Sequence, residues 1–152
     1  MPETPNTCPT SPAAERNKSA ILATLQTLLP ASGRLLEIAA GTGQHAVFCA
    51  AGLPGWQWQA TDPDPASLLA IAAWSAAHLS PGLLQALQLD VLADPWPTAL
   101  THAGAHWDAL FCANMLHIER LVARCCGLTL NPVRSVGEIG RASCRERVSV
   151  LV

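Results

Sequence analysis

The hydrophobic positions of this chain switch between helical spacing and short apolar runs, which is the pattern of an α/β protein. Ser11 and Pro12 suit the cap and first position of a helix, and apolar residues then recur at helical spacing as far as Leu29. Further along, short strand-like runs alternate with apolar-rich helical segments. The predicted strands are Leu35–Ile38, Trp56–Thr61, Leu87–Leu89 and Trp107–Ala113, and the helices between them cover residues 44–51 and 65–79.

A glycine-rich loop follows the first predicted strand. Glu37 lies at the carboxyl end of that strand, and Gly41 and Gly43 precede the helix that begins near Gln44. Glycines let a backbone turn sharply and let a ligand approach closely, while the helix offers its free N–H groups to whatever lies over the loop. Open α/β sheets bind ligands at this edge. The stretch is therefore expected to bind a nucleotide-type ligand.

Two ligands compete for this loop. Gly41, Gly43 and Ala46 fit the dinucleotide fingerprint G-x-G-x-x-G/A, which predicts an NAD-dependent oxidoreductase. The Glu37 carboxylate, however, would repel a pyrophosphate at low dielectric. S-adenosylmethionine has no phosphate and carries a sulfonium and an ammonium group, both of which a carboxylate attracts. We therefore expect S-adenosylmethionine, with NAD as the alternative and an ordinary glycine turn as the remaining interpretation.

Acidic residues also end the second and third predicted strands. Asp62 follows the second strand, where a carboxylate has two oxygens to accept the vicinal hydroxyls of a ribose. Its alternative role as a helix cap is filled better by Asp64, which precedes Pro65. Asp90 follows the third strand and can accept the exocyclic amine of an adenine, although an aspartate that only shapes a turn fits equally well.

The fourth predicted strand runs into Asn114 and His117. The first and fourth strands are neighbours in a doubly wound sheet, so these two side chains are expected to face the methyl group from the acceptor side. His117 can act as a base, since its pKa moves easily across neutrality, although a lone histidine also serves structural roles. The sequence here departs from the Asn/Asp-Pro-Pro-aromatic signature of enzymes that methylate amino groups of nucleic acids. A nucleic-acid acceptor is therefore not expected.

Composition narrows the class of protein. The 152 residues allow one domain of ordinary size, and a hydrophobic content of 50% allows a substantial core. No apolar run approaches the length of a membrane span, and no basic segment precedes an apolar one as in a secretory signal. The six cysteines show no regular spacing, so neither a disulfide framework nor a zinc site is expected, and the compartment is expected to be the reducing cytoplasm.

Four motifs occur together in one order: residues 11–18, 37–45, 61–64 and 112–118. This set resembles the uncharacterised domain family that includes methyltransferase-like protein 26. The resemblance covers residues 11–118 and implies a Rossmann-like class I methyltransferase fold, with S-adenosylmethionine as cofactor and a small-molecule or protein acceptor. It implies that Glu15, Arg16, Asn17 and Lys18 face a substrate rather than only solvent. The donor-binding residues it implies are Glu37, Ala39 (in place of the motif's first glycine), Gly41, Gly43, Gln44, His45 and Asp62, and the end of the third strand adds Asp90 as a candidate.

The end of the chain has a different character. Residues 1–118 carry three basic and eight acidic side chains, whereas residues 119–152 carry six arginines and three acids. Residues 138–148 resemble a translated sequencing-adapter read. Residues 1–10 are therefore expected to be a disordered arm, and residues 119–152 a non-native tail on a truncated domain. The alternative is a basic tail that binds nucleic acid.

The truncation predicts an incomplete parallel sheet of about four strands. The outer edge of the fourth strand, Trp107–Ala113, is expected to be unpaired, and an open apolar edge favours aggregation. Residues 135–152 are expected to pack poorly. On this basis the chain as it stands is expected to be an inactive methyltransferase fragment, or a protein that binds S-adenosylmethionine without catalysis.

Overall fold

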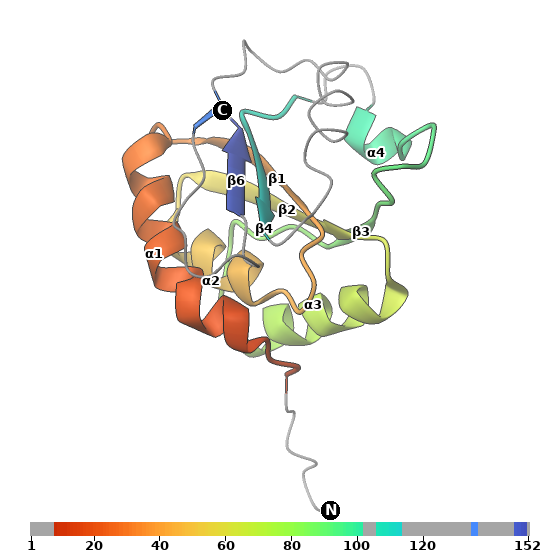
Figure 1. Ribbon diagram of the computed structural model, residues 1–152, viewed down its shortest axis with the longest axis horizontal. Coiled ribbons are helices and arrows are strands. Elements are labelled where there is room, and N and C mark those ends of the chain that lie inside the picture. Colours follow the sequence, from red (N-terminus) through yellow and green to blue (C-terminus); the bar gives the residue numbers. More distant parts are fainter. Residues whose placement is uncertain (1–7, 102–105, 114–134, 137–147, 152) are drawn as a thin grey trace, which may run out of the picture.

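The computed structural model describes residues 8–101, 106–113, 135–136 and 148–151 (Figure 1). Helices and strands alternate along the first two thirds of the chain, as the hydrophobic pattern predicts. The elements are α1 (Pro12–Leu28), β1 (Gly33–Ile38), α2 (Gln44–Gly52), β2 (Trp56–Asp62), α3 (Pro65–Ala77), β3 (Leu87–Gln88), α4 (Thr98–Thr101), β4 (Ala109–Ala113), β5 (Ser135–Val136) and β6 (Val148–Leu151). Among the described residues, no helix is long and apolar enough to cross a membrane.

One sheet organises the molecule, with strand order β3-β2-β1-β4-β6-β5. The pairs β1–β2, β1–β4 and β2–β3 are parallel, so their carboxyl ends lie at the same edge. Glu37 of β1 is in register with Ala60 of β2 and with Phe111 of β4. The prediction of a four-stranded parallel sheet with β1 next to β4 is confirmed.

The two faces of the sheet carry different cores. Side chains alternate along a strand, so Leu35 and Glu37 point to one face of β1 while Leu36 and Ile38 point to the other. Helices α1, α2 and α3 cover the first face, where Ile21, Leu25, Cys49 and Ile71 belong to one buried cluster with both tryptophans of β2. The short helix α4 and residues 89–107 cover the second face, where Trp96, Leu100 and Trp107 pack on Leu36 and Leu110. Helices on both faces make a three-layer fold.

Local signals in the sequence set the helix starts. The Ser11 hydroxyl accepts a hydrogen bond from Ala14 N, and Pro12 begins α1. The Asp64 side chain accepts from Ala66 N at 2.9 Å and caps α3, with Pro65 at the first position. Both caps are confirmed. The ends are less well predicted, because α3 stops at Ala77 and β4 begins only at Ala109.

The expectation of an unpaired β4 edge is wrong. Strand β6 pairs with β4 in antiparallel register, from Leu110 opposite Leu151 to Ala113 opposite Val148, and β5 pairs with β6. The backbone groups of β4 therefore have partners on both sides. Two short segments of residues 135–152, a range that was expected to pack poorly, therefore join the sheet. The argument that an open edge inactivates the chain no longer holds.

Candidate functional site

The loop between β1 and α2 lies at the carboxyl edge of the sheet and has an unusual backbone. Ala39, Gly41 and Gly43 all have positive φ, at 55°, 59° and 84°. Such values cost about 1–2 kcal/mol for a residue with a side chain, so Ala39 carries strain where the related motif has glycine. Gly41 and Gly43 differ in what surrounds them. A Cβ on Gly43 would lie 2.9 Å from Ile71 Cα, whereas a Cβ on Gly41 would meet nothing within 4 Å. The space above Gly41 is open to a ligand.

Asp62 ties this loop to the end of β2. Its Oδ2 accepts a hydrogen bond from the Gly41 backbone N–H at 2.9 Å, and its Oδ1 accepts from Asp64 N at 2.9 Å. The side chain is buried. Each carboxylate oxygen has a second lone pair, so Asp62 can still accept two hydroxyl groups while it holds the loop. The predicted role on a ribose remains a prediction, and a structural role in shaping the loop is added to it.

Glu37 is buried beneath the loop, on the face of the sheet that α1, α2 and α3 cover. Its Oε2 accepts the indole N–H of Trp58 at 2.7 Å. Burial raises the pKa of the Glu37 carboxyl to about 8, with a smaller contribution from the negative charge of Asp62 and an opposing one from the Trp58 hydrogen bond. A cation placed nearby would favour the ionised form. The alternating pattern of β2 put Trp58 on the buried face, but nothing in the sequence paired it with Glu37.

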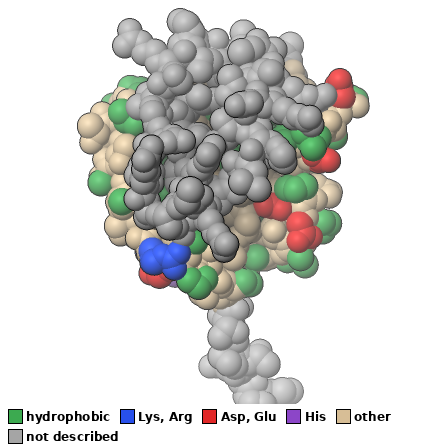
Figure 2. All heavy atoms as spheres, in the orientation of Figure 1, with side chains coloured by type: hydrophobic (Ala, Val, Ile, Leu, Met, Phe, Trp, Pro, Cys, Tyr) green, Lys and Arg blue, Asp and Glu red, His purple; other side chains and the backbone are tan. Residues whose placement is uncertain are grey.

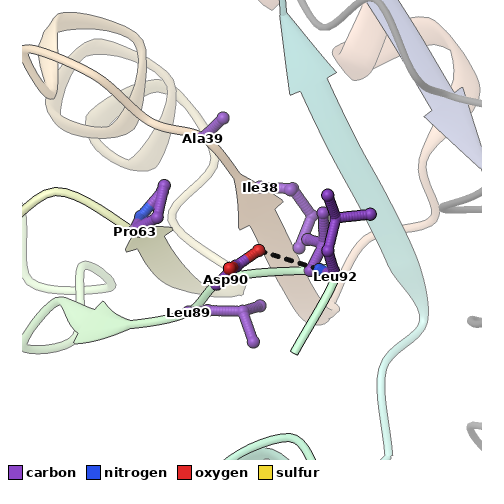
Figure 3. A pocket seen from close by; sticks show the side chains of 7 residues that line it. Ile38, Ala39, Pro63, Leu89, Asp90 and Leu92 are labelled. Carbon is purple, nitrogen blue, oxygen red and sulfur yellow. Dashed lines mark hydrogen bonds between the residues drawn. The ribbon is translucent and has the colours of Figure 1, made fainter. Parts of the chain in front are cut away.

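A small cavity of about 120 Å³ opens beside the loop (Figure 3). Residues that follow three parallel strands line it, and nearly all of them are apolar. Asp90 is the polar exception, and its Oδ1 accepts a hydrogen bond from Leu92 N at 2.9 Å. The lining residues are Ile38, Ala39, Pro63, Leu89, Asp90, Val91 and Leu92. The cavity is largely apolar with one acceptor in its lining, which suits an aromatic ring that carries an amine. The sequence predicted Ala39 and Asp90 as donor-binding residues and missed the other apolar residues of the lining.

Residues of α1 contact the start of α2. Glu15 accepts a hydrogen bond from Gln44 Nε2 at 3.1 Å, and Asn17 Oδ1 lies 2.7 Å from His45 Nε2. Lys18 lies over the Phe48 ring, 5.1 Å from its centroid. Gln44 and His45 are both buried and face α1. The motif at 15–18 and the motif at 44–45, which the sequence assigned to substrate and donor, are therefore partners of one another.

His45 is held as a neutral imidazole. Burial lowers its pKa to about 4, and the charge of Lys18 adds to this effect. Since Asn17 Oδ1 can only accept, the ring carries its proton on Nε2. The ring edge also meets Phe111 of β4, with centroids 5.9 Å apart, and Phe111 in turn packs against Trp58 at 5.5 Å.

The remaining predicted site residues are less informative. Arg16 is exposed on α1. Asn114 and His117, the predicted acceptor-side residues, lie outside the described residues, so their roles remain predictions. Within the part of the chain that the structure describes, no three His, Cys, Asp or Glu side chains are grouped as a metal site would need.

Charge is unevenly distributed over the described surface. On the face shown in Figure 2, acidic side chains gather mainly on one side, and the visible basic side chain lies on the other. Asp62 and Asp90 at the strand ends belong to the sequence's acidic first part, which has three basic residues in all. Among the described residues that line the cavity, Asp90 is the charged one, and its negative charge favours a ligand with positive charge.

Solved structures share this architecture at low sequence identity. The YcgJ protein from Bacillus subtilis is 16% identical with a TM-score of 0.56, and the match covers 77% of this chain and 47% of that one. The N-terminal domain of human METTL16, solved in complex with SAH, is 13% identical with a TM-score of 0.54, covering 95% and 71%. The S-adenosylmethionine-dependent methyltransferase SibL is 14% identical with a TM-score of 0.54, covering 91% and 55%. This chain thus spans about half the length of YcgJ and SibL.

The sheet order, the three layers and these similarities define a Rossmann-like class I methyltransferase fold. Residues 8–136 match the family described as protein of unknown function DUF938. The chain belongs to that family. The matched segment extends beyond the residues 11–118 on which the sequence resemblance was based.

Proposed function

We propose that this protein binds S-adenosylmethionine at the β1–α2 loop and transfers its methyl group to a small-molecule or protein acceptor. The observation that carries the proposal is the pair of carboxylates around the loop. Glu37 lies buried beneath it, and Asp62 is bonded to the Gly41 N–H within it. A ligand with a sulfonium and an ammonium group gains from both carboxylates. The METTL16 domain was solved in complex with SAH, and SibL is an S-adenosylmethionine-dependent methyltransferase, which supports the same ligand class.

The same geometry disfavours the dinucleotide alternative. A pyrophosphate needs free backbone N–H groups at the loop and at the start of the following helix. Here Asp62 already occupies the Gly41 N–H, and the Glu15 carboxylate lies beside the first residue of α2 through its bond to Gln44. A phosphate placed there would meet negative charge on several sides. NAD is therefore the poorer fit.

The residues of this chain fit separate parts of the proposed donor. Asp62 would hold the ribose hydroxyls, and the cavity at Leu89 and Asp90 would hold the adenine ring. Glu37 would balance the positive charge of the donor. When bound, S-adenosylmethionine supplies an electrophilic methyl group, and the protein's contribution to such a transfer is chiefly orientation and the exclusion of water. His117 and Asn114 are proposed on the acceptor side, with His117 able to take up a proton from the acceptor.

Calorimetric titration is the direct test of donor binding. The protein is titrated at pH 7.5 with S-adenosylmethionine, with S-adenosylhomocysteine, which lacks the sulfonium charge, and with NAD. We expect binding of the first two and none of NAD. Binding of NAD alone would overturn the proposal. Incubation with methyl-labelled donor in a cell lysate then distinguishes an enzyme, which labels an acceptor, from a protein that binds the donor without turnover.

A further inference from the structure

Helices α1 and α2 lie side by side and run in the same direction (Figure 1). Hydrogen bonds join them at both ends. At the amino ends, Glu15 and Asn17 of α1 contact Gln44 and His45 of α2. At the other end, Gln26 Nε2 donates to the carbonyl oxygen of Gly52 at 3.1 Å. The first set lies directly after the glycine loop, and the second lies one helix length away from it.

Gln44 is the centre of the first set. Its Oε1 accepts from the backbone N–H of Ser11 and from the Thr42 hydroxyl, the latter at 3.1 Å. Its Nε2 donates to Glu15, whose other oxygen bonds Lys18 at 2.5 Å. One buried carboxamide thus joins the cap of α1, the loop residue Thr42 and the first turn of α1. A displacement of Glu15 would release a side chain that also fixes the loop.

The second contact of this set restrains the next residue of α2. His45 is buried, and its Nε2–H donates to Asn17 Oδ1 at 2.7 Å. The ring is held on its other side by the edge contact with Phe111. Gln44 and His45 are the first two residues of α2. Their side chains therefore determine how the helix leaves Gly43, and so where its free N–H groups point.

We propose that Glu15 and Asn17 are positioning residues that act through Gln44 and His45 to hold the donor loop in its binding conformation. This rests on the proposed function for the identity of the donor. It differs from the two interpretations that the sequence allowed, a solvated helix face and direct contact with substrate. The exposed Lys18–Glu15 ion pair contributes little by itself, because surface pairs at three-residue spacing are weak. The contacts to buried Gln44 and His45 are therefore the ones that hold the conformation of the loop.

The test compares substitutions at the two ends of the same helix pair. Asn17→Ala and Glu15→Ala remove the contacts beside the loop, and Gln26→Ala is the matched control at the far end. Affinity for S-adenosylmethionine is measured by calorimetry, the thermal midpoint by calorimetric scanning, and loop mobility by hydrogen exchange over residues 39–46 without ligand. A typical hydrogen bond contributes about 0.5–1.5 kcal/mol, which corresponds to about a two- to tenfold change in affinity. We expect about five- to tenfold weaker binding and faster loop exchange in the two loop-end variants.

The control and a conservative variant decide the outcome. Gln26→Ala is expected to change affinity less than about twofold, even where its midpoint falls as much as that of Asn17→Ala. Glu15→Gln retains an oxygen for Gln44 Nε2 and is expected to restore affinity. Equal losses of affinity at both ends, or unchanged loop exchange in Asn17→Ala and Glu15→Ala, would overturn the proposal. If wild-type protein binds no S-adenosylmethionine, the proposed function fails, and hydrogen exchange still decides whether these residues hold the loop.

Discussion

The carboxylate of Asp62 accepts a hydrogen bond from the backbone N–H of Gly41 at 2.9 Å, so the end of β2 holds the loop that follows β1. This bond makes one residue serve the fold and the proposed site together. The carboxylate fixes the loop with one lone pair of Oδ2, and each of its oxygens keeps a second lone pair that can accept a bond from a ligand. A substitution at Asp62 therefore changes stability and binding at once.

Asp62→Ala is expected to lower the free energy of unfolding by about 1–3 kcal/mol, because Gly41 N and Asp64 N lose a buried acceptor. Binding of S-adenosylmethionine is expected to weaken more than tenfold. Urea unfolding and calorimetric titration measure the two effects. Asp64→Ala is the control, since it removes the cap of α3, which costs about 1 kcal/mol, and leaves the loop untouched. Equal affinity in Asp62→Ala and wild type would remove Asp62 from the site.

Glu37→Gln is expected to stabilise the ligand-free protein at alkaline pH. The pKa of Glu37 is raised from 4.5 to about 8, so the folded protein keeps a proton that the unfolded chain releases. Stability is therefore fully present below pH 4.5 and is lost as the pH rises towards 8, by an amount on the order of a few kcal/mol. Glutamine removes this dependence. Thermal unfolding at pH 5 and pH 8 should show a midpoint difference in wild type that shrinks in the variant.

The same substitution is expected to weaken donor binding. Without an ionisable group at position 37, the positive charge of S-adenosylmethionine loses its buried counter-ion. Wild-type affinity should rise between pH 6 and pH 8 as the ligand draws the proton from Glu37, and the affinity of Glu37→Gln should stay level. A variant that binds as tightly as wild type at pH 8 would show that Glu37 is only a structural acid.

Alanine substitutions at the two glycines of the loop are expected to have different effects on stability and on binding. Gly43→Ala brings a Cβ to 2.9 Å from the Ile71 backbone and should destabilise the fold, because α3 cannot move away locally. Gly41→Ala meets nothing within 4 Å, so its cost in stability is the positive φ alone, about 1–2 kcal/mol. Its Cβ, however, occupies the open space above the loop. Gly41→Ala should thus retain its fold and lose S-adenosylmethionine, and a fully binding Gly41→Ala would place the ligand elsewhere.

Acid is expected to destabilise the fold through His45. The pKa of His45 falls from 6.5 to about 4 in the folded protein, so between these values the unfolded chain takes up a proton that the folded one refuses. His45 therefore does not change the free energy of unfolding above pH 6.5 and lowers it increasingly as the pH falls towards 4. Urea unfolding of wild type and His45→Gln at pH 7 and pH 5 checks the sign. The variant should gain relative stability at pH 5, and a constant difference between the two proteins would contradict the prediction.

Strong local signals in the sequence predicted the donor side of the fold well. Four short apolar runs, an acid near the carboxyl end of β1 and of β2, and caps at Ser11 and Asp64, both followed by a proline, each reflect one local physical preference. The positions of β1, α2 and β2 followed from them. The brevity of β3 and the pairing of β6 with β4 did not follow, because a two-residue strand has no period and an antiparallel partner is set by distant residues.

The contacts of Glu15 and Asn17 could not be predicted from the sequence pattern. Two polar residues near the start of a helix are typical of a solvated face, and family resemblance alone assigned them to a substrate. Their true neighbours depend on the register between α1 and α2, which side-chain packing determines across about 30 residues of sequence. The bond between Glu37 and Trp58 is hidden for the same reason.

Phe111 of β4 contacts residues on both sides of the donor loop's support, Trp58 and His45. Its ring meets Trp58, which bonds the acid beneath the loop, and it meets His45, which α1 restrains. The same strand ends at Ala113 and leads to the residues predicted to face the acceptor. An acceptor that shifts the end of β4 would therefore move one ring and, through it, two supports of the donor loop. Binding of the two substrates is then expected to be cooperative, and the coupling must act equally in both directions.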